Sequence, residues 1–85
     1  MKVRILYFAS LREAVGRERE EVSLPQDVVS AGQLRAWLRE RGGAWQQELA
    51  SSRAVRIAVN QQMANEQTPI CADAEIAFFP PVTGG

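Results

Sequence analysis

The 85-residue chain carries ten basic and ten acidic side chains, a length that suits one domain and a balance that leaves no net charge to attract nucleic acid or an anionic membrane. It has no histidine and a single cysteine, Cys71, which excludes a histidine-based metal site, a nucleophile–histidine pair and an internal disulfide. No apolar run approaches the roughly 20 residues of a membrane span, and no signal-peptide pattern is present. We therefore expect a cytoplasmic domain that binds no metal, membrane or nucleic acid.

The first third of the chain has the alternation of strands. Residues 2–9 predict a first strand that turns one set of side chains toward a core, namely Val3, Ile5 and Tyr7. Residues 10–15 predict a short helix that Gly16 ends. Residues 17–24 are charged and then alternate, which is typical of an exposed edge strand, and residues 25–27 predict a turn.

The main helix is expected next. Ser30 and Gln33 fit a capping box, in which the Ser30 hydroxyl caps the helix and the Gln33 side chain reaches back. Helical spacing then connects Leu34, Trp37, Leu38 and Arg41. The glycines at residues 42–43 are expected to end this helix, and residues 45–49 predict one further short helical turn. We interpret the two tryptophans as core residues.

Two more strands are predicted in the last third. Residues 54–60 form the first of them, followed by a turn at residues 60–62 and short irregular structure at residues 63–69. Residues 75–79 form the last strand, which ends at two prolines because proline has no N–H to donate. The inward side chains of these strands are Val55, Ile57, Val59, Ile76 and Phe78. Cys71, which precedes the last strand, is interpreted as a small packing residue rather than a sulfur relay.

The order strand, strand, helix, strand, strand predicts the fold class. Because one main helix is available to cover the single apolar face of the sheet, we expect an α+β roll with a mixed sheet of four to five strands and the helix across one face. The domain is placed at residues 1–79. Residues 80–85 form an extended C-terminal tail that ends in Gly-Gly.

The tail suits the delivery of a carboxyl group into another protein. Its two prolines favour a stiff, extended exit, its six residues can reach roughly 20 Å, and its terminal glycines can enter a narrow channel. Gly85 would carry the reactive carboxyl group, and the inserted residues would be Pro80, Pro81, Val82, Thr83 and Gly84. A carboxylate needs activation, for which adenylation by ATP is the usual route, and the chain has no phosphate-binding motif. We therefore expect a separate activating enzyme that consumes ATP, and no autonomous enzyme activity.

An apolar patch is predicted on the outward face of the sheet. Leu6, Phe8, Ala77 and Phe79 have outward parity, and Met63 could extend the patch. Such a patch on a small domain usually marks an interface, although loops of the same chain could cover it instead. The two aromatic residues favour the interface, because buried aromatics commonly anchor complexes.

The sequence resembles the small subunit of molybdopterin synthase, the MoaD family. The resemblance is carried by residues 3–9, 11–13, 58–61 and, most specifically, by residues 75–85, EIAFFPPVTGG. Where relatives often have Asp-Gly-Asp-Glu, this chain has Ala-Asp-Ala-Glu at residues 72–75, so the turn there must form without glycine.

The resemblance implies a ubiquitin-like, β-grasp fold and a specific chemistry. An E1-like enzyme would adenylate Gly85, which then becomes a thiocarboxylate. The tail would insert into the large synthase subunit, within a heterotetramer, and donate sulfur to cyclic pyranopterin monophosphate, two transfers making the dithiolene of molybdopterin. The family places its large-subunit contact at the positions of Phe8, Met63 and Phe79.

Two alternatives remain open from the sequence. One is a sulfur carrier for another pathway, such as thiamine synthesis or tRNA thiolation, because the fold and the Gly-Gly end are common to these proteins. The other is a ubiquitin-like modifier or interaction module without sulfur chemistry. Intact mass after co-expression with the activating enzyme and a sulfur source discriminates the second alternative, since a thiocarboxylate has sulfur in place of one oxygen.

Overall fold

The computed structural model describes residues 1–81, so the predictions for Val82, Thr83, Gly84 and Gly85 lie outside the described residues. Its elements, in chain order, are β1 (Lys2–Tyr7), α1 (Ala9–Val15), β2 (Arg19–Ser23), α2 (Ala31–Arg39), α3 (Gly43–Glu48), β3 (Arg56–Val59), β4 (Gln62–Ala64) and β5 (Glu75–Phe79). None of the helices described is long and apolar enough to cross a membrane.

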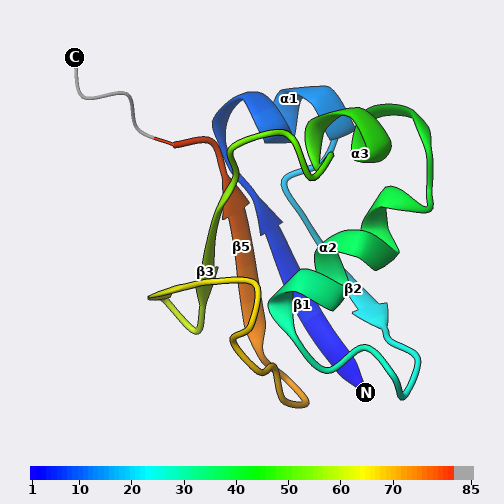
Figure 1. The fold of residues 1–85 in the computed structure, drawn as a ribbon, viewed down its shortest axis with the longest axis vertical. Coiled ribbons are helices and arrows are strands. Elements are labelled where there is room, and N and C mark those ends of the chain that lie inside the picture. The colour runs from blue at the N-terminus through cyan, green and yellow to red at the C-terminus, as the bar shows by residue number, and fades with distance from the viewer. Residues whose placement is uncertain (82–85) are drawn as a thin grey trace.

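The strands form one mixed sheet in the order β2-β1-β5-β3-β4. β1 and β5 pair in parallel, whereas the other neighbours are antiparallel. Helix α2 crosses one face of the sheet, and α1 and α3 lie at the end of the sheet where β5 ends (Figure 1). The predicted α+β class, with a mixed sheet and one main helix across a face, is therefore confirmed.

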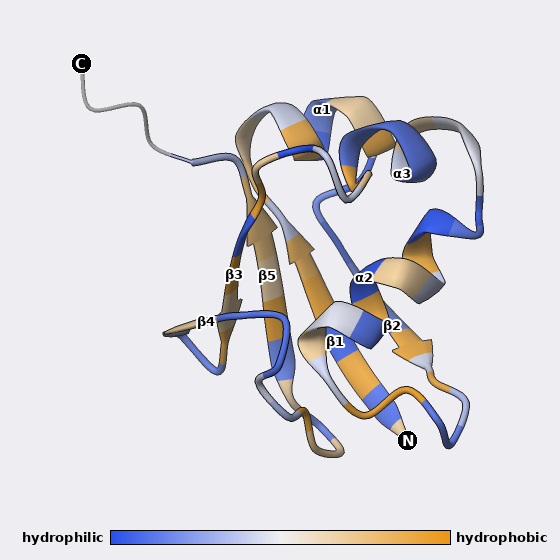
Figure 2. Ribbon diagram, in the orientation of Figure 1, coloured by the Kyte–Doolittle hydropathy of each residue, from blue (hydrophilic) through white to orange (hydrophobic). Residues whose placement is uncertain are grey.

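The core lies between α2 and the inner face of the sheet. Every inward side chain predicted on β1 and β5 is buried, and Figure 2 shows hydrophobic residues gathered on these central strands. The largest fully buried side chains are Tyr7, Phe78, Ile5, Leu34, Leu38, Leu49, Ile76 and Val3. Full burial of each aliphatic or Phe side chain stabilises the fold by about 1.5–3 kcal/mol, so this one cluster holds the helix on the sheet. Both tryptophans pack against it while partly buried.

Several predicted bounds differ from the structure: the first strand is shorter and Ala9 begins α1, and Val55 lies before β3 rather than within it. Two further differences concern the main helix and the stretch after β3. The main helix ends at Arg39, before the two glycines, because the next residues form tight turn bonds such as Arg41 N to Leu38 O at 3.1 Å. The stretch predicted as irregular contains β4, which pairs with β3 after a two-residue turn. Asn60 and Gln61 make this turn with φ of 51° and 68°, the geometry of a hairpin turn that is more often signalled by Asn-Gly.

The N-terminus of α2 is fixed by its cap and by the chain before β5. The Ser30 hydroxyl accepts a hydrogen bond from Gln33 N at 3.2 Å, as predicted, but the Gln33 side chain accepts from Val29 N, one residue before the cap. Gly32 N donates to Glu66 O at 2.9 Å. A Cβ atom at Gly32 would stand 2.8 Å from Glu66 Cβ, so this close approach requires glycine.

A buried arginine ties α2 to the chain that enters β3. Arg35 is 3% exposed, and its guanidinium donates to three backbone oxygens at 2.6–2.9 Å, those of Leu49, Ala50 and Arg53. Glu66 supplies the opposite charge at 3.4 Å. Burial lowers the pKa of Arg35, which Glu66 partly offsets. These bonds hold carbonyls that follow the end of α3, of which Ala50 O also accepts from Arg53 N and Leu49 O from Arg39.

The turn before β5 forms without glycine, and Asp73 adopts the left-handed backbone in its place. Asp73 has φ of 66°, a conformation that Asp tolerates better than most residues, and its N–H donates to Lys2 O at 2.7 Å. Cys71 begins this turn and is exposed, so its interpretation as a packing residue is wrong. The turn stands at the opposite end of β5 from the tail.

A polar network joins the edge of the sheet to the helices on its inner side. Tyr7 is 1% exposed; its hydroxyl donates to Glu20 at 2.7 Å and accepts from the Trp45 indole N–H at 3.1 Å. Arg41 donates two hydrogen bonds to the Glu20 carboxylate, at 2.7 and 3.0 Å, and lies 4.9 Å from the centre of the Trp45 ring. Burial raises the pKa of Tyr7. Burial would also raise the pKa of Glu20, but hydrogen bonds from Arg41 and Tyr7 outweigh it and lower that pKa.

Glu20 should therefore make stability depend on acid pH. Because its pKa is lower in the folded state, its contribution is complete above the ordinary value of 4.5 and is lost as the pH falls through the folded-state value. We expect Glu20→Gln to cost about 2 kcal/mol of unfolding free energy at pH 7, since it removes charge-assisted hydrogen bonds, and to cost less in acid. Urea unfolding across this pH range measures both.

The control for this prediction is Glu18→Gln, which changes an exposed carboxylate in the same segment that forms no ion pair among residues 1–81. It should alter stability by less than about 0.5 kcal/mol. A cost for Glu20→Gln that stays constant from neutral to acid pH would contradict the assignment.

Candidate functional site

The base of the tail is held in the middle of the sheet. β5 has a neighbour on each edge, and its last residue, Phe79, pairs with Arg56 of β3. On the other edge, Phe8 N donates to Phe78 O at 3.2 Å. Pro80 follows Phe79 outside any strand, as the sequence predicted. The chain therefore leaves the domain from a strand bonded on both sides.

Apolar residues cover the outer face of the sheet beside this exit. One row runs across four strands, with Leu6 opposite Ala77, Ala77 opposite Ala58, and Ala58 opposite Met63. Phe8 and Phe79 lie at the end nearest the tail and contact edge to face, with ring centres 6.4 Å apart. We call this surface the outer patch; its residues are Leu6, Phe8, Ala58, Met63, Ala77 and Phe79.

Exposure differs among the predicted patch residues. Met63 is 61% exposed and Phe8 46%, whereas Leu6 and Phe79 are half-buried. Ala77 is only 8% exposed, so the prediction that its side chain is exposed is wrong. The reason is that a small side chain on the central strand is screened by its larger neighbours. The patch is thus a shallow surface with aromatic and methionine side chains standing above an alanine floor.

Ala58 is a patch residue that sequence reasoning did not name. The signal was present, because a strand with Ile57 and Val59 inward must turn Ala58 outward. The small side chain of alanine offers little contact area, so Ala58 was not singled out as a binding residue. Its role here is to leave room above the middle of the sheet.

The backbone after β1 places Phe8 at the rim of the patch. Ala9 begins α1 with φ of 53°, a conformation that is uncommon for a residue with a Cβ. Phe8 O accepts hydrogen bonds from Leu11 N and Arg12 N, at 3.1 and 3.3 Å. These bonds fix the abrupt change from strand to helix, so the Phe8 ring stays beside Phe79.

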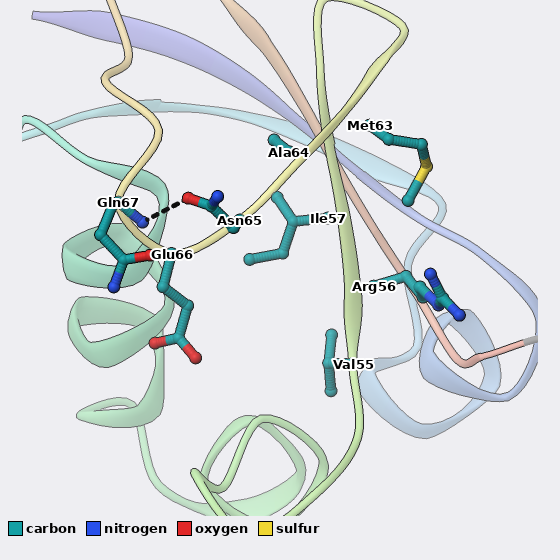
Figure 3. Close-up of a pocket in the computed structure, with 8 residues that line it drawn as sticks. All are labelled: Val55, Arg56, Ile57, Met63, Ala64, Asn65, Glu66 and Gln67. Carbon is teal, nitrogen blue, oxygen red and sulfur yellow. Dashed lines mark hydrogen bonds between the residues drawn. The ribbon is translucent and has the colours of Figure 1, made fainter.

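The patch ends at a depression along the β3–β4 edge (Figure 3). β4 stops at Ala64, and the chain then turns away from β3 through Asn65, whose side chain accepts from Gln67 N at 2.9 Å. Figure 3 shows Met63 and Arg56 on the same side of β3, with Ile57 on the other side. Met63 and Arg56 therefore belong to the outer face, while Ile57 belongs to the core.

The outer patch offers contact area and a fixed exit for the tail. The side chains of the patch are apolar. Tyr7, whose pKa is strongly raised by burial, lies on the inner face instead. Among residues 1–81 there is no group of three or more acidic, cysteine or histidine side chains positioned to hold a metal ion. What the described residues can do chemically is to bind an apolar surface and to aim the end of the chain.

Comparisons with known proteins agree with this arrangement. The sequence matches the ThiS family over residues 5–85. It is 36% identical over 83 residues to the molybdopterin synthase sulfur carrier subunit of Escherichia coli, covering 98% of this chain and 99% of that protein. These matches confirm the resemblance to the MoaD family.

Solved structures share the fold. One is a chain in the protein–protein complex of subunits 1 and 2 of molybdopterin-converting factor from Helicobacter pylori, with a TM-score of 0.69, 26% identity and coverage of 100% of both chains. Another is small archaeal modifier protein 1 from Haloferax volcanii, with a TM-score of 0.75, 23% identity and coverage of 95% of this chain and 98% of that one. The predicted ubiquitin-like, β-grasp fold is confirmed.

The two faces of β3 and β4 should respond oppositely to substitution. Met63→Gln should change the unfolding free energy by less than about 0.5 kcal/mol, because the side chain is already 61% exposed. Ile57→Ala, the matched change on the inner face, should cost about 2–5 kcal/mol because Ile57 is 3% exposed. Chemical denaturation of both variants measures this. A large loss with Met63→Gln would mean that Met63 is part of the core.

Proposed function

The chain belongs to the ThiS family, and on that basis we propose that it is the sulfur-carrier subunit of a molybdopterin synthase, with its own C-terminus as the reactive part. The observation that carries the proposal is the continuity between the outer patch and the tail. Phe79 is both the last residue of β5 and a member of the patch. A partner that covers the patch therefore receives the tail at the edge of the same contact.

The proposed partner is the large subunit of the synthase. The H. pylori structure, whose chain is 26% identical to this one, is a complex of the two subunits of molybdopterin-converting factor. The contact residues we propose are Phe8, Met63 and Phe79, of which the first two are the most exposed aromatic and sulfur-containing side chains on the outer face. Apolar and aromatic anchors of this type commonly provide most of the affinity of an interface.

The proposed chemistry takes place at Gly85. A separate E1-like enzyme would use ATP to convert the terminal carboxylate to an acyl-adenylate, and a sulfur nucleophile would then displace AMP at the acyl carbon to give a thiocarboxylate. Residues 80–84 would enter the large subunit, where the sulfur passes to cyclic pyranopterin monophosphate. The chain itself needs no cofactor for these steps, because it supplies only the carboxyl group and its delivery.

Within this family the sulfur could serve another pathway, such as thiamine synthesis or tRNA thiolation. The 36% identity to a molybdopterin synthase subunit over nearly the whole of both chains favours the synthase. The likeness to the archaeal modifier, at 23% identity, concerns the fold alone. Formation of molybdopterin by the chain with its large subunit separates the pathways, and intact mass after activation separates sulfur carriage from modification.

Removing Gly85, or adding one residue after it, should abolish sulfur transfer and leave the melting temperature unchanged. The reason is that the reactive group is defined by its place at the chain end, while the core lies within residues 3–78. A reconstituted synthase assay and thermal melts test both parts. Thr83→Ser keeps the length and both glycines, so it should stay active. Near-normal transfer by the truncated chain would refute the carrier role.

Phe79→Ala should weaken binding to the large subunit by about 2 kcal/mol or more, because an aromatic anchor is lost from the contact where the tail begins. Its cost to folding should be smaller, since Phe79 is only half-buried. Phe78→Ala, the neighbouring change on the inner face, should instead cost about 3–5 kcal/mol of stability. Calorimetry and melting curves distinguish these outcomes. Unchanged affinity with a collapsed melting temperature for Phe79→Ala would place Phe79 in the core.

A further inference from the structure

The outer face is not electrically uniform, although the chain as a whole is neutral. Lys2, Arg17, Arg35, Arg41 and Arg53 take part in ion pairs among residues 1–81. Five arginines take part in none of these pairs, namely Arg4, Arg12, Arg19, Arg39 and Arg56. Of these, Arg19 and Arg56 are exposed and stand beside the outer patch in the strand register. Neither guanidinium therefore lies within ion-pair distance of a carboxylate of the described residues, although Arg19 shares a depression with Glu21 and Glu75.

The strand register places both arginines at the border of the outer patch. Arg19 of β2 lies opposite Leu6, which puts it at one end of the apolar row that finishes with Met63. Arg56 of β3 lies opposite Phe79, at the base of the tail. The half of the face nearest the tail is therefore apolar with a basic border.

The other half of the same face is balanced. In the row beyond the patch, Arg4 lies between Glu21 on β2 and Glu75 on β5, so charges alternate across the strands. Glu21 also pairs with Lys2 at 3.7 Å. The strand register thus leaves two arginines of this face without an opposing carboxylate, namely Arg19 at one end of the apolar row and Arg56 beside Phe79.

We propose that Arg19 and Arg56 form an electrostatic border of the partner interface, and that the large subunit presents carboxylates opposite them around its own apolar surface. The inference rests on the proposed function and adds the charge of the partner's surface to it. From strand and residue spacings the two arginines stand roughly 15 Å apart, which is greater than the screening length of about 8 Å at physiological salt. They therefore act as two separate contacts and not as one basic cluster.

The physical consequence is steering more than tight binding. Exposed ion pairs at the border of an interface add little to affinity, because water and salt screen them. They do accelerate association and fix the orientation of approach. Arg56, next to Phe79, orients the partner so that its channel meets the tail, while Arg19 fixes the opposite side of the patch.

The test measures association kinetics between the purified chain and the purified large subunit of the same organism, from low salt to about 0.5 M. The double variant Arg19→Gln/Arg56→Gln removes two positive charges. The control Gln46→Glu/Gln47→Glu changes the net charge equally, at exposed positions of α3. Arg19→Lys/Arg56→Lys keeps the charges and serves as the rescue.

The double variant Arg19→Gln/Arg56→Gln, here the border variant, should associate about three- to tenfold more slowly at low salt. Its association rate should depend less on salt than that of the wild type, and its dissociation rate should change little. The control and the lysine variant should behave like the wild type. Association of the border variant at the control's rate, or faster, would overturn the inference while leaving the proposed function intact. If the wild-type chain did not bind the large subunit at all, the proposed function would fail and this inference with it.

Discussion

The fold depends on the position of its last strand. β5 lies between β1 and β3, so the element nearest the chain end is bonded along both edges and carries Ile76 and Phe78 into the core. The chain between β4 and β5 is held in turn by the start of α2, where Gly32 N donates to Glu66 O, and by the turn at Asp73, whose N–H donates to Lys2 O.

Successive side chains of a strand point to opposite faces of the sheet, so one face can form the core while the other forms a surface. On β5, Phe78 points into the core and Phe79 lies in the outer patch, one residue apart. Because α2 covers the inner face and α1 and α3 lie at the end of the sheet, residues of the outer face can change without disturbing the packing of α2. The network of buried Tyr7, half-buried Glu20 and exposed Arg41 adds to this separation, since it holds the edge of the sheet from the inner side.

Much of this arrangement could be predicted from the sequence, because it rests on local periodicity. The inward sets on β1 and β5, the Ser30 cap and the stop at Gly16 all follow from residue spacing, and the structure confirms them. Contacts between distant segments could not be predicted. Nothing near Arg35 indicates that it will donate to carbonyls of residues 49, 50 and 53, and nothing near Gly32 indicates the approach of Glu66.

The site was predictable to a similar degree. Parity identified the exposed Phe8, but the burial of Ala77 depends on neighbours from two other strands. β4 was missed because three residues after an Asn-Gln turn give too short a pattern to recognise. The basic border required the register of β2 and β3, which no single segment encodes.

The parallel pairing of β1 with β5 also has a mechanical consequence. β1 starts at the end of the sheet opposite the exit of the tail, so a pull on Pro80 against the body of the domain slides β5 lengthwise along both neighbours (Figure 1). A lengthwise pull loads all the hydrogen bonds between β5 and its neighbours β1 and β3 at once. A pull across the strands would instead break these hydrogen bonds one after another. The arrangement of the two ladders therefore resists extension of the domain from its C-terminal end.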